Sequence, residues 1–138
     1  MMNNYLIKSC FVLLLLSMNL MEANAQLENL NPMEKMLVKK WQVTRTVYEM
    51  ELVNIPPETA PIFAFSADYK WKKEIMEPKL VYHGTWSVDT AKQVIFITWE
   101  EKFDTNTYQY KIKKLTEQEL IIEPMNANTE TVYYRVKE

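Results

Sequence analysis

The stretch from Tyr82 to Trp99, which reads YHGTWSVDTAKQVIFITW, contains two strand patterns, one turn and the only glycine of the chain. In its first arm Tyr82, Gly84 and Trp86 alternate with polar residues, and a β-strand imposes this period of two. Residues 89–92 supply a turn, and the second arm is rich in β-branched and aromatic residues. The stretch therefore predicts the central hairpin of an antiparallel sheet.

The same period of two continues on both sides of this hairpin. Strand patterns cover residues 41–51, 62–67, 69–76, 80–88, 93–101, 108–113, 120–123 and 131–137. About eight short strands separated by turns are typical of an all-β protein. Paired in sequence order, they close most economically into an antiparallel up-and-down barrel, which leaves no exposed edge. An immunoglobulin-like sandwich is the alternative, although most connections are too short for a Greek-key crossing.

A short helix is expected just before the first strand. Asn31 has the side chain of an N-cap, Pro32 suits the first helical position, and Glu34 stands where a capping box places its carboxylate. The helix should end between Leu37 and Lys39. The adjacent prolines Pro56-Pro57 predict a longer loop after the first strand.

The first 25 residues have the layout of a secretory signal peptide: positive charge at Lys8, an apolar core over residues 11–21, and the small-residue site Ala23-Asn24-Ala25. The apolar run is shorter than the roughly 20 residues of a membrane-spanning helix, so no permanent anchor is expected. Cleavage near Ala25-Gln26 would leave one domain, residues 26–138, without cysteine, because Cys10 lies in the leader. We expect an exported, periplasmic or extracellular protein that depends on its hydrophobic core.

Three motifs of this chain resemble the small lipocalin-like proteins that Bacteroidota export: LVKKW at 37–41, GTWSVD at 84–89 and KLTEQEL at 114–120. The resemblance implies a lipocalin-like β-barrel, or a related calyx, that binds a small hydrophobic molecule. In lipocalins an arginine near the end of the barrel covers the tryptophan of the first strand, so the resemblance implies that Arg135 packs on Trp41. Lys39 stands where true lipocalins have glycine.

The sequence offers little to catalysis, so no enzyme, cofactor or metal site is predicted. His83 is the single histidine, and the two serines of the mature chain, Ser66 and Ser87, have no G-x-S-x-G surroundings. One glycine cannot build a phosphate-binding loop. Glu100 and Glu101 point to opposite faces of their strand, so they do not form a ready pair for acid–base catalysis.

Lysines interleave with aromatic residues in two strands, a pattern that also occurs in nucleic-acid-binding proteins. These lysines are Lys70, Lys72, Lys73, Lys111, Lys113 and Lys114. Strand alternation explains them more simply, with lysines outward and aromatic rings inward. Because the net charge is −2, no nucleic-acid partner is expected.

The aromatic residues predicted to point inward are the candidate ligand-binding set. They are Trp71, Tyr82, Trp86, Phe96, Tyr108, Tyr110 and Tyr134, with Trp41 and Gly84 in structural roles. An eight-stranded barrel is just wide enough to be filled by side chains or to hold one small ligand. So many large rings favour a mostly filled interior with a shallow pocket at one mouth, and a real cavity is the alternative.

Arg45 sharpens this question, because strict alternation places it on the inward face of the first strand. An interior guanidinium would require a carboxylate, a tyrosine network or an anionic ligand. A β-bulge that turns Arg45 outward is the alternative. The leading functional hypothesis is a non-enzymatic protein that binds a small hydrophobic or amphipathic molecule; the second is a solid-core barrel that acts as an interaction or scaffold module through its outer surface.

Overall fold

A computed structural model describes residues 12–18, 25–100, 104–125 and 130–137. Cys10 and most of the predicted leader, including Ala23 and Asn24, lie outside these ranges, as do parts of the connections that follow the strand patterns at 93–101 and 120–123. Within the described residues, no helix combines the length and the apolar character needed to cross a membrane.

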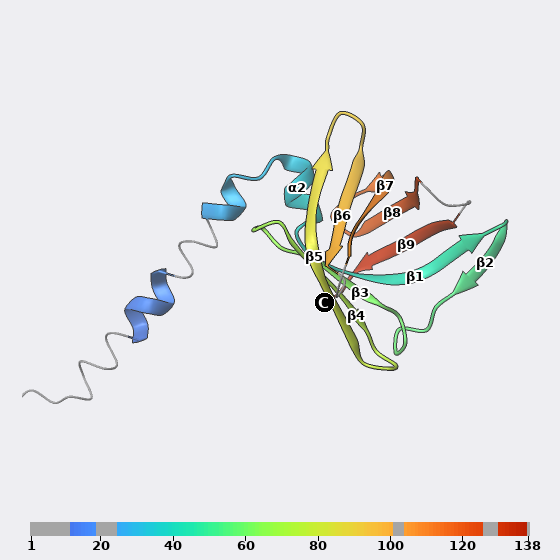
Figure 1. Cartoon of the computed structure of the whole chain (residues 1–138), viewed down its shortest axis with the longest axis horizontal. Helices are drawn as coiled ribbons and strands as arrows, with labels where there is room; N and C mark the ends of the chain where they lie inside the picture. Colours follow the sequence, from blue (N-terminus) through green and yellow to red (C-terminus); the bar gives the residue numbers. More distant parts are fainter. Residues whose placement is uncertain (1–11, 19–24, 101–103, 126–129, 138) are drawn as a thin grey trace, which may run out of the picture.

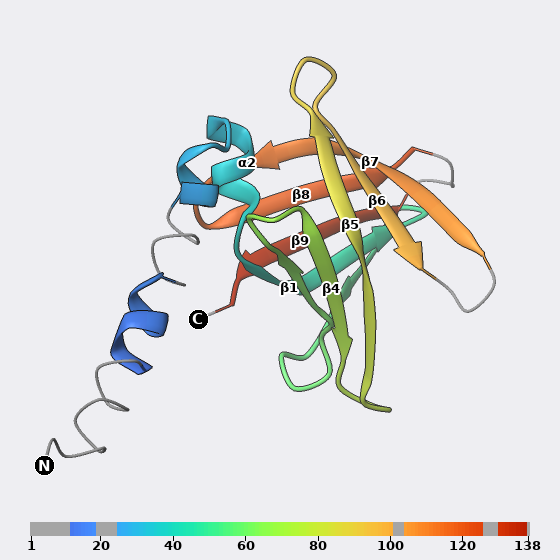
Figure 2. The ribbon, with the colours of Figure 1, turned by 60° about the vertical axis from the view of Figure 1, so that its left-hand side comes forward.

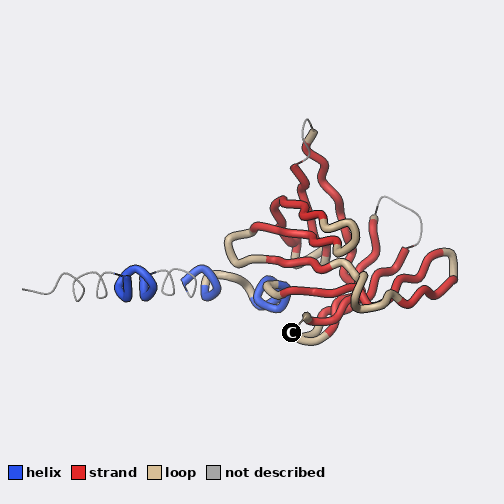
Figure 3. The backbone as a smooth tube through the Cα atoms, turned by 90° about the horizontal axis from the view of Figure 1, so that it is seen from below, coloured by secondary structure: helices blue, strands red, loops and turns tan. Residues whose placement is uncertain are grey.

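The described residues 12–18 and 25–28 are helical, and they are followed by one further short helix and nine strands. They are α2 (Pro32–Leu37), β1 (Lys40–Tyr48), β2 (Glu51–Asn54), β3 (Ile62–Phe65), β4 (Lys70–Ile75), β5 (Leu80–Asp89), β6 (Val94–Glu100), β7 (Thr105–Leu115), β8 (Glu119–Pro124) and β9 (Glu130–Val136). Figure 3 shows that strand makes up most of the chain after α2.

The strands form one antiparallel sheet in the order β2-β1-β3-β4-β5-β6-β7-β8-β9, and a β1–β9 ladder closes it. β2 lies beside the second half of β1, so the other eight strands form the barrel (Figures 1 and 2). The predicted eight-stranded antiparallel up-and-down barrel with an N-terminal helix is confirmed. The sandwich alternative is wrong, because short connections join neighbouring strands of a single closed sheet.

The cap of α2 forms as predicted. The Asn31 side chain accepts a hydrogen bond from the Glu34 amide at 2.9 Å, and the Glu34 carboxylate accepts one from the Asn31 amide at 3.0 Å. Leu37 is fully buried, and its carbonyl accepts a hydrogen bond from Trp41 Nε1 at 3.0 Å. α2 thereby packs on one end of the barrel core, which we call the helix end (Figure 2).

The β5–β6 hairpin exists, but Phe96 does not point inward. Phe96 pairs with Ser87 on the outer face, while Ile97 pairs with Trp86 and Ile95 with Val88. Ile95 and Ile97 are buried in the core instead. The prediction failed because β6 is apolar on both faces, so alternation alone cannot choose between them; the loop at residues 90–93 sets the register.

Arg45 lies on the outer face, as the bulge alternative proposed. The β1–β9 register shifts between Val43 and Arg45, which is where an extra residue enters β1. Val43 pairs with Tyr134 inside the barrel, whereas Arg45 pairs with Tyr133 outside. The bulge also reverses the alternation beyond it, so Val47 lies on the outer face, although strict alternation from Trp41 would place it inside.

Arg135 does not cover Trp41. Trp41 pairs with Val136, so Arg135, one residue earlier on β9, points to the outer face opposite Gln42. Lys39 takes the place expected for Arg135, with its Nζ 5.7 Å from the Trp41 ring centroid. The lysine that departs from the lipocalin pattern therefore supplies the cation beside this tryptophan.

β2 occupies part of the region predicted as the end of the first strand and a loop. Glu49 and Met50 have φ of 47° and 69° and form the two-residue turn of a β1–β2 hairpin. All four residues of β2 are exposed. In Figure 1 this hairpin reaches away from the side of the barrel where α2 lies.

Candidate functional site

At the end of the barrel opposite α2, which we call the mouth, most inward side chains are half-buried, although Trp71 and Tyr134 are buried; the helix end is closed by buried side chains. The C-terminal halves of β4 and β6 meet there with the N-terminal halves of β5, β7 and β9. Inward-facing residues near this end form the mouth cluster: Phe63, Trp71, Lys73, Tyr82, Trp99, Tyr108, Tyr110 and Tyr134.

Aromatic rings connect most of the mouth cluster. The Tyr134 and Phe63 ring centroids lie 5.2 Å apart, and Phe63 and Trp71 are 5.6 Å apart. Trp71 stacks on Trp99 at 5.2 Å, and Trp99 then contacts Tyr82 at 5.3 Å. Tyr108 reaches Trp99 from the other side at 5.4 Å. The mouth cluster therefore contains five of the predicted residues: ring contacts connect Trp71, Tyr82, Tyr108 and Tyr134, and Tyr110 is the fifth.

Trp86 belongs to the helix end. Its ring packs edge-on against Phe65 at 5.5 Å and lies 5.2 Å from the ring of Tyr69, while its Nε1 donates to the Ser66 carbonyl at 3.0 Å. Trp86 and Trp41 are thus buried core residues whose indole N–H groups are satisfied. His83 is an exposed, outward-facing residue of β5.

Tyr110 and Tyr134 supply hydroxyl groups in a poorly hydrated environment. Burial, with smaller effects of Tyr108 and Glu130, raises the pKa of Tyr110 to about 12. Burial likewise raises the pKa of Tyr134, with Tyr110 and Glu130 contributing. Both phenols stay neutral at physiological pH and can donate hydrogen bonds.

Lys73 is the residue that the sequence interpretation missed. It points inward, with Nζ 5.3 Å from the ring centroid of Phe63 and 5.4 Å from that of Trp99. The prediction that all six lysines face outward is therefore wrong for Lys73, although Lys72 does face out and pairs with Glu74 at 2.7 Å. The signal was present, because Lys73 follows the inward Trp71 by two residues.

Burial lowers the pKa of Lys73, and the charge of Glu130 opposes this shift only in part. Among the described residues, Lys73 has no hydrogen bond and no carboxylate within 4.0 Å. Its ammonium group instead makes cation–π contacts with two aromatic rings, those of Phe63 and Trp99.

Two indole N–H groups of the mouth cluster also lack partners among the described residues. Trp71 Nε1 and Trp99 Nε1 are both buried without a hydrogen bond, unlike the indoles of Trp41 and Trp86. A buried donor without an acceptor costs about 1–3 kcal/mol. The mouth cluster thus combines a cation and unsatisfied donors with a large apolar surface. Within the described ranges, no group of three or more His, Cys, Asp or Glu residues could hold a metal ion.

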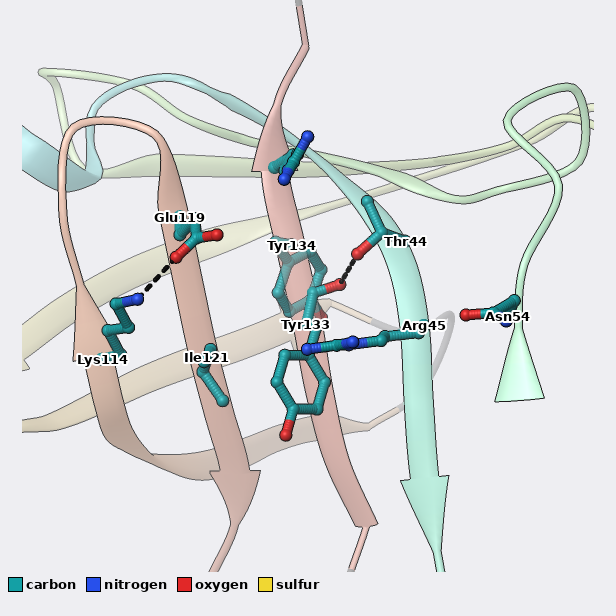
Figure 4. Close-up of a pocket in the computed structure, with 9 residues that line it drawn as sticks. Thr44, Arg45, Asn54, Lys114, Glu119, Ile121, Tyr133 and Tyr134 are labelled. Carbon is teal, nitrogen blue, oxygen red and sulfur yellow. Dashed lines mark hydrogen bonds and ion pairs between the residues drawn. The ribbon is translucent and has the colours of Figure 1, made fainter. Parts of the chain in front are cut away.

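A second concave region lies on the outer face of the barrel, where the β1 bulge turns Arg45 outward (Figure 4). This outer groove has a volume of about 420 Å³. It is lined by Thr44, Arg45, Asn54, Lys114, Glu119, Ile121, Tyr133, Tyr134 and Arg135. Arg45, predicted for a ligand site, and Arg135, predicted to pack on Trp41, therefore both line a groove that the sequence did not indicate.

The comparison with solved structures finds an uncharacterized protein from Bacteroides eggerthii DSM 20697, with a crystal structure at 2.60 Å resolution. The TM-score is 0.59 at 13% sequence identity, and the match covers 73% of this chain and 99% of that chain. This likeness shows a shared fold. No protein-family model matches the chain, and no curated protein matches it. The resemblance to the lipocalin-like family stays a prediction.

Proposed function

We propose that this chain is an exported, non-enzymatic β-barrel protein that binds a small amphipathic molecule with an anionic end at its mouth. Lys73 receives the anionic group there, and the surrounding rings contact the apolar part. Removal of the predicted leader after Ala25 is part of this proposal.

The observation that carries the proposal is the position of Lys73. A lysine that points into a barrel without a carboxylate partner among the described residues is destabilising, which its lowered pKa reflects. Such a cost is accepted at functional sites, and an anionic ligand would remove it. The two unpartnered indole N–H groups lie in the same cluster and are further donors for a polar head group.

The apolar part of the ligand has a surface at the rim of the mouth. Leu80 and Tyr48 occupy inward-facing positions on β5 and β1, yet they are 44% and 48% exposed. Because rings already pack the space below them, the ligand would lie in a shallow position and not deep in the barrel. This arrangement favours a short single-chain amphiphile.

Binding of dodecanoate, measured by tryptophan fluorescence and calorimetry, tests the proposal. We expect dodecanoate to bind and to quench or shift the emission of the Trp71–Trp99 pair, and dodecanol to bind about tenfold more weakly or less, because it lacks the charge that pairs with Lys73. Lys73→Met should abolish this preference. Lys72→Met is the matched control, because Lys72 is the outward neighbour on the same strand, and it should keep the preference.

Equal affinity for the two probes in the wild-type protein, or an unchanged preference in Lys73→Met, would contradict the proposal. Absence of binding by both probes would favour the second function, a barrel with a filled interior that acts as an interaction module through its outer surface. The continuous ring contacts from Tyr134 to Tyr108 favour that alternative.

A further inference from the structure

We propose that the outer groove is a separate binding site for a small hydroxylated carboxylate, the chemical class of the acidic sugars. Arg45 and Arg135 would hold the carboxylate, and the remaining polar side chains would bind the hydroxyl groups.

The β1 bulge creates this groove. Without the extra residue, Arg45 would continue the inward alternation of Val43; with it, the side chain turns outward and lies over the ring of Tyr133. The guanidinium carbon is 4.1 Å from the ring centroid, and Figure 4 shows the side chain extending from β1 across β9. Bulges often direct a side chain toward a functional site, and stacking limits the freedom of the guanidinium before a ligand arrives.

The charges in the groove are unbalanced. Three cations, Arg45, Lys114 and Arg135, line it together with one carboxylate, Glu119. Lys114 already pairs with Glu119 at 2.7 Å. Among the described residues, neither arginine has a carboxylate within 4.0 Å or a side-chain hydrogen bond. The pKa of Glu119 reports this positive field, since Lys114 first, and then Arg135 and Arg45, lower it.

The chemistry of the lining selects the ligand class. Two guanidinium groups that have no carboxylate partner are suited to a ligand carboxylate. Thr44, Asn54 and the carboxylate of Glu119 offer hydrogen-bonding groups that fit hydroxyls, and Ile121 adds a small apolar contact. Glu119 would repel a compact anion without hydroxyl groups. A volume of about 420 Å³ falls within the roughly 300–1,000 Å³ of small-molecule sites.

The charged groups of the mouth and of the outer groove lie on opposite faces of the sheet. Arg45 lies outside the sheet, whereas Lys73 points into the barrel. Tyr134 belongs to the mouth cluster and also lines the groove, so the two sites share this residue. The arginines that would hold a carboxylate in the groove are nevertheless separate from the lysine that would hold one at the mouth.

Titration of the ¹⁵N-labelled protein with galacturonate, galactose and sulfate, followed by amide and arginine side-chain NMR signals, tests this inference. We expect galacturonate to shift the signals of Arg45, Asn54 and Arg135 in a saturable way, and galactose and sulfate to bind about tenfold more weakly or less. Arg45→Gln and Arg135→Gln should each weaken galacturonate binding by about tenfold or more. Lys111→Gln removes an exposed cation that does not line the groove and should leave the affinity unchanged.

Several results would overturn the inference: no saturable shift with galacturonate, equal affinity for galactose or sulfate, or full affinity in either arginine variant. The two arginine variants are surface substitutions, and a well-dispersed spectrum establishes that they fold. Their dodecanoate affinity should equal that of the wild-type protein, so a failure at the groove is distinguished from a failure at the mouth.

Discussion

Gly84 lies where strands β5 and β6 and the ring of Trp71 are in close contact. A β-carbon at this position would overlap the backbone carbonyl oxygen of Thr98 and lie 3.4 Å from Trp71 Cε3. The strand opposite cannot move without disturbing its ladder, and Trp71 is only 2% exposed. The absence of a side chain, and not an unusual backbone angle, makes glycine necessary here.

We therefore predict that Gly84→Ala lowers the free energy of unfolding by about 1–3 kcal/mol and that Gly84→Val lowers it further, because both overpack the β5–β6 contact. Urea denaturation measures the change. Ser87→Ala, an exposed outward change on the same strand, should remain within about 0.5 kcal/mol of the wild-type protein. A Gly84→Ala midpoint equal to that of wild type would show that the strands are farther apart than described.

Lys73 should lower stability while it supports binding. Its folded-state pKa lies below the unfolded value, so the protonated form is destabilised by folding, and stability should rise as pH increases from the folded pKa toward the unfolded one. At neutral pH we predict that Lys73→Met raises the melting temperature, because it replaces an interior cation with an apolar side chain of similar length. A fall in melting temperature would mean that the two ring contacts outweigh the cost of burial.

At this scale the sequence predicted the inward positions of Trp71, Tyr82 and Tyr134, because each lies in a strand with clear alternation. The prediction was wrong at Phe96, because both faces of its strand are apolar. It was also wrong at Arg135, because its position was taken from the family resemblance and not from the alternation of side chains along its strand. The alternation that places Trp71 inside also indicated Lys73. Assigning lysines to the outer face by residue type alone overlooks this alternation, and for that reason the interior cation is not predicted.

Among the elements, the β1–β2 hairpin has an unfavourable turn sequence. Glu49 and Met50 both have positive φ, a conformation that costs non-glycine residues about 1–2 kcal/mol. Met50 is 98% exposed, so its side chain offers little compensation. The turn is held by the pairing of β1 with β2 and not by its own residues.

Replacing Glu49-Met50 with Asn-Gly should therefore stabilise the protein by about 1 kcal/mol, because both residues suit a type I′ turn. Met50→Ala, which keeps the backbone strain, should change stability by less than about 0.5 kcal/mol. Urea denaturation of the wild-type protein and the two variants measures these changes. A loss of stability in the Asn-Gly variant would contradict the observed turn geometry.

The other elements differ in how far the sequence determined them. The N-cap residue and the proline were sufficient to predict the start of α2, because helix capping depends only on neighbouring residues. β2 was not recognised as a separate strand, because its turn lacks glycine and two prolines follow it closely. The bulge in β1 cannot be recognised from the alternation of residues in the sequence, because it is defined by the pairing with β9. The outer groove could therefore not be predicted.

For the whole molecule, closure followed from sequential short strands, and the likeness to the Bacteroides eggerthii protein at 13% identity agrees with it. The filling of the interior could not be predicted, because it depends on which rings meet across the barrel. The structure has an aromatic chain from Tyr134 to Tyr108 with Lys73 lying over two of its rings. The proposed function requires that Lys73 is a charged group that an anionic ligand stabilises.

The most direct test is the pKa of Lys73 itself, measured by NMR of its side chain with and without dodecanoate and assigned by loss of the signal in Lys73→Met. We predict a pKa below that of an exposed lysine in the free protein, because burial disfavours the charged form, and a rise on addition of dodecanoate, because the carboxylate stabilises it. An ordinary lysine pKa that dodecanoate leaves unchanged would contradict the account.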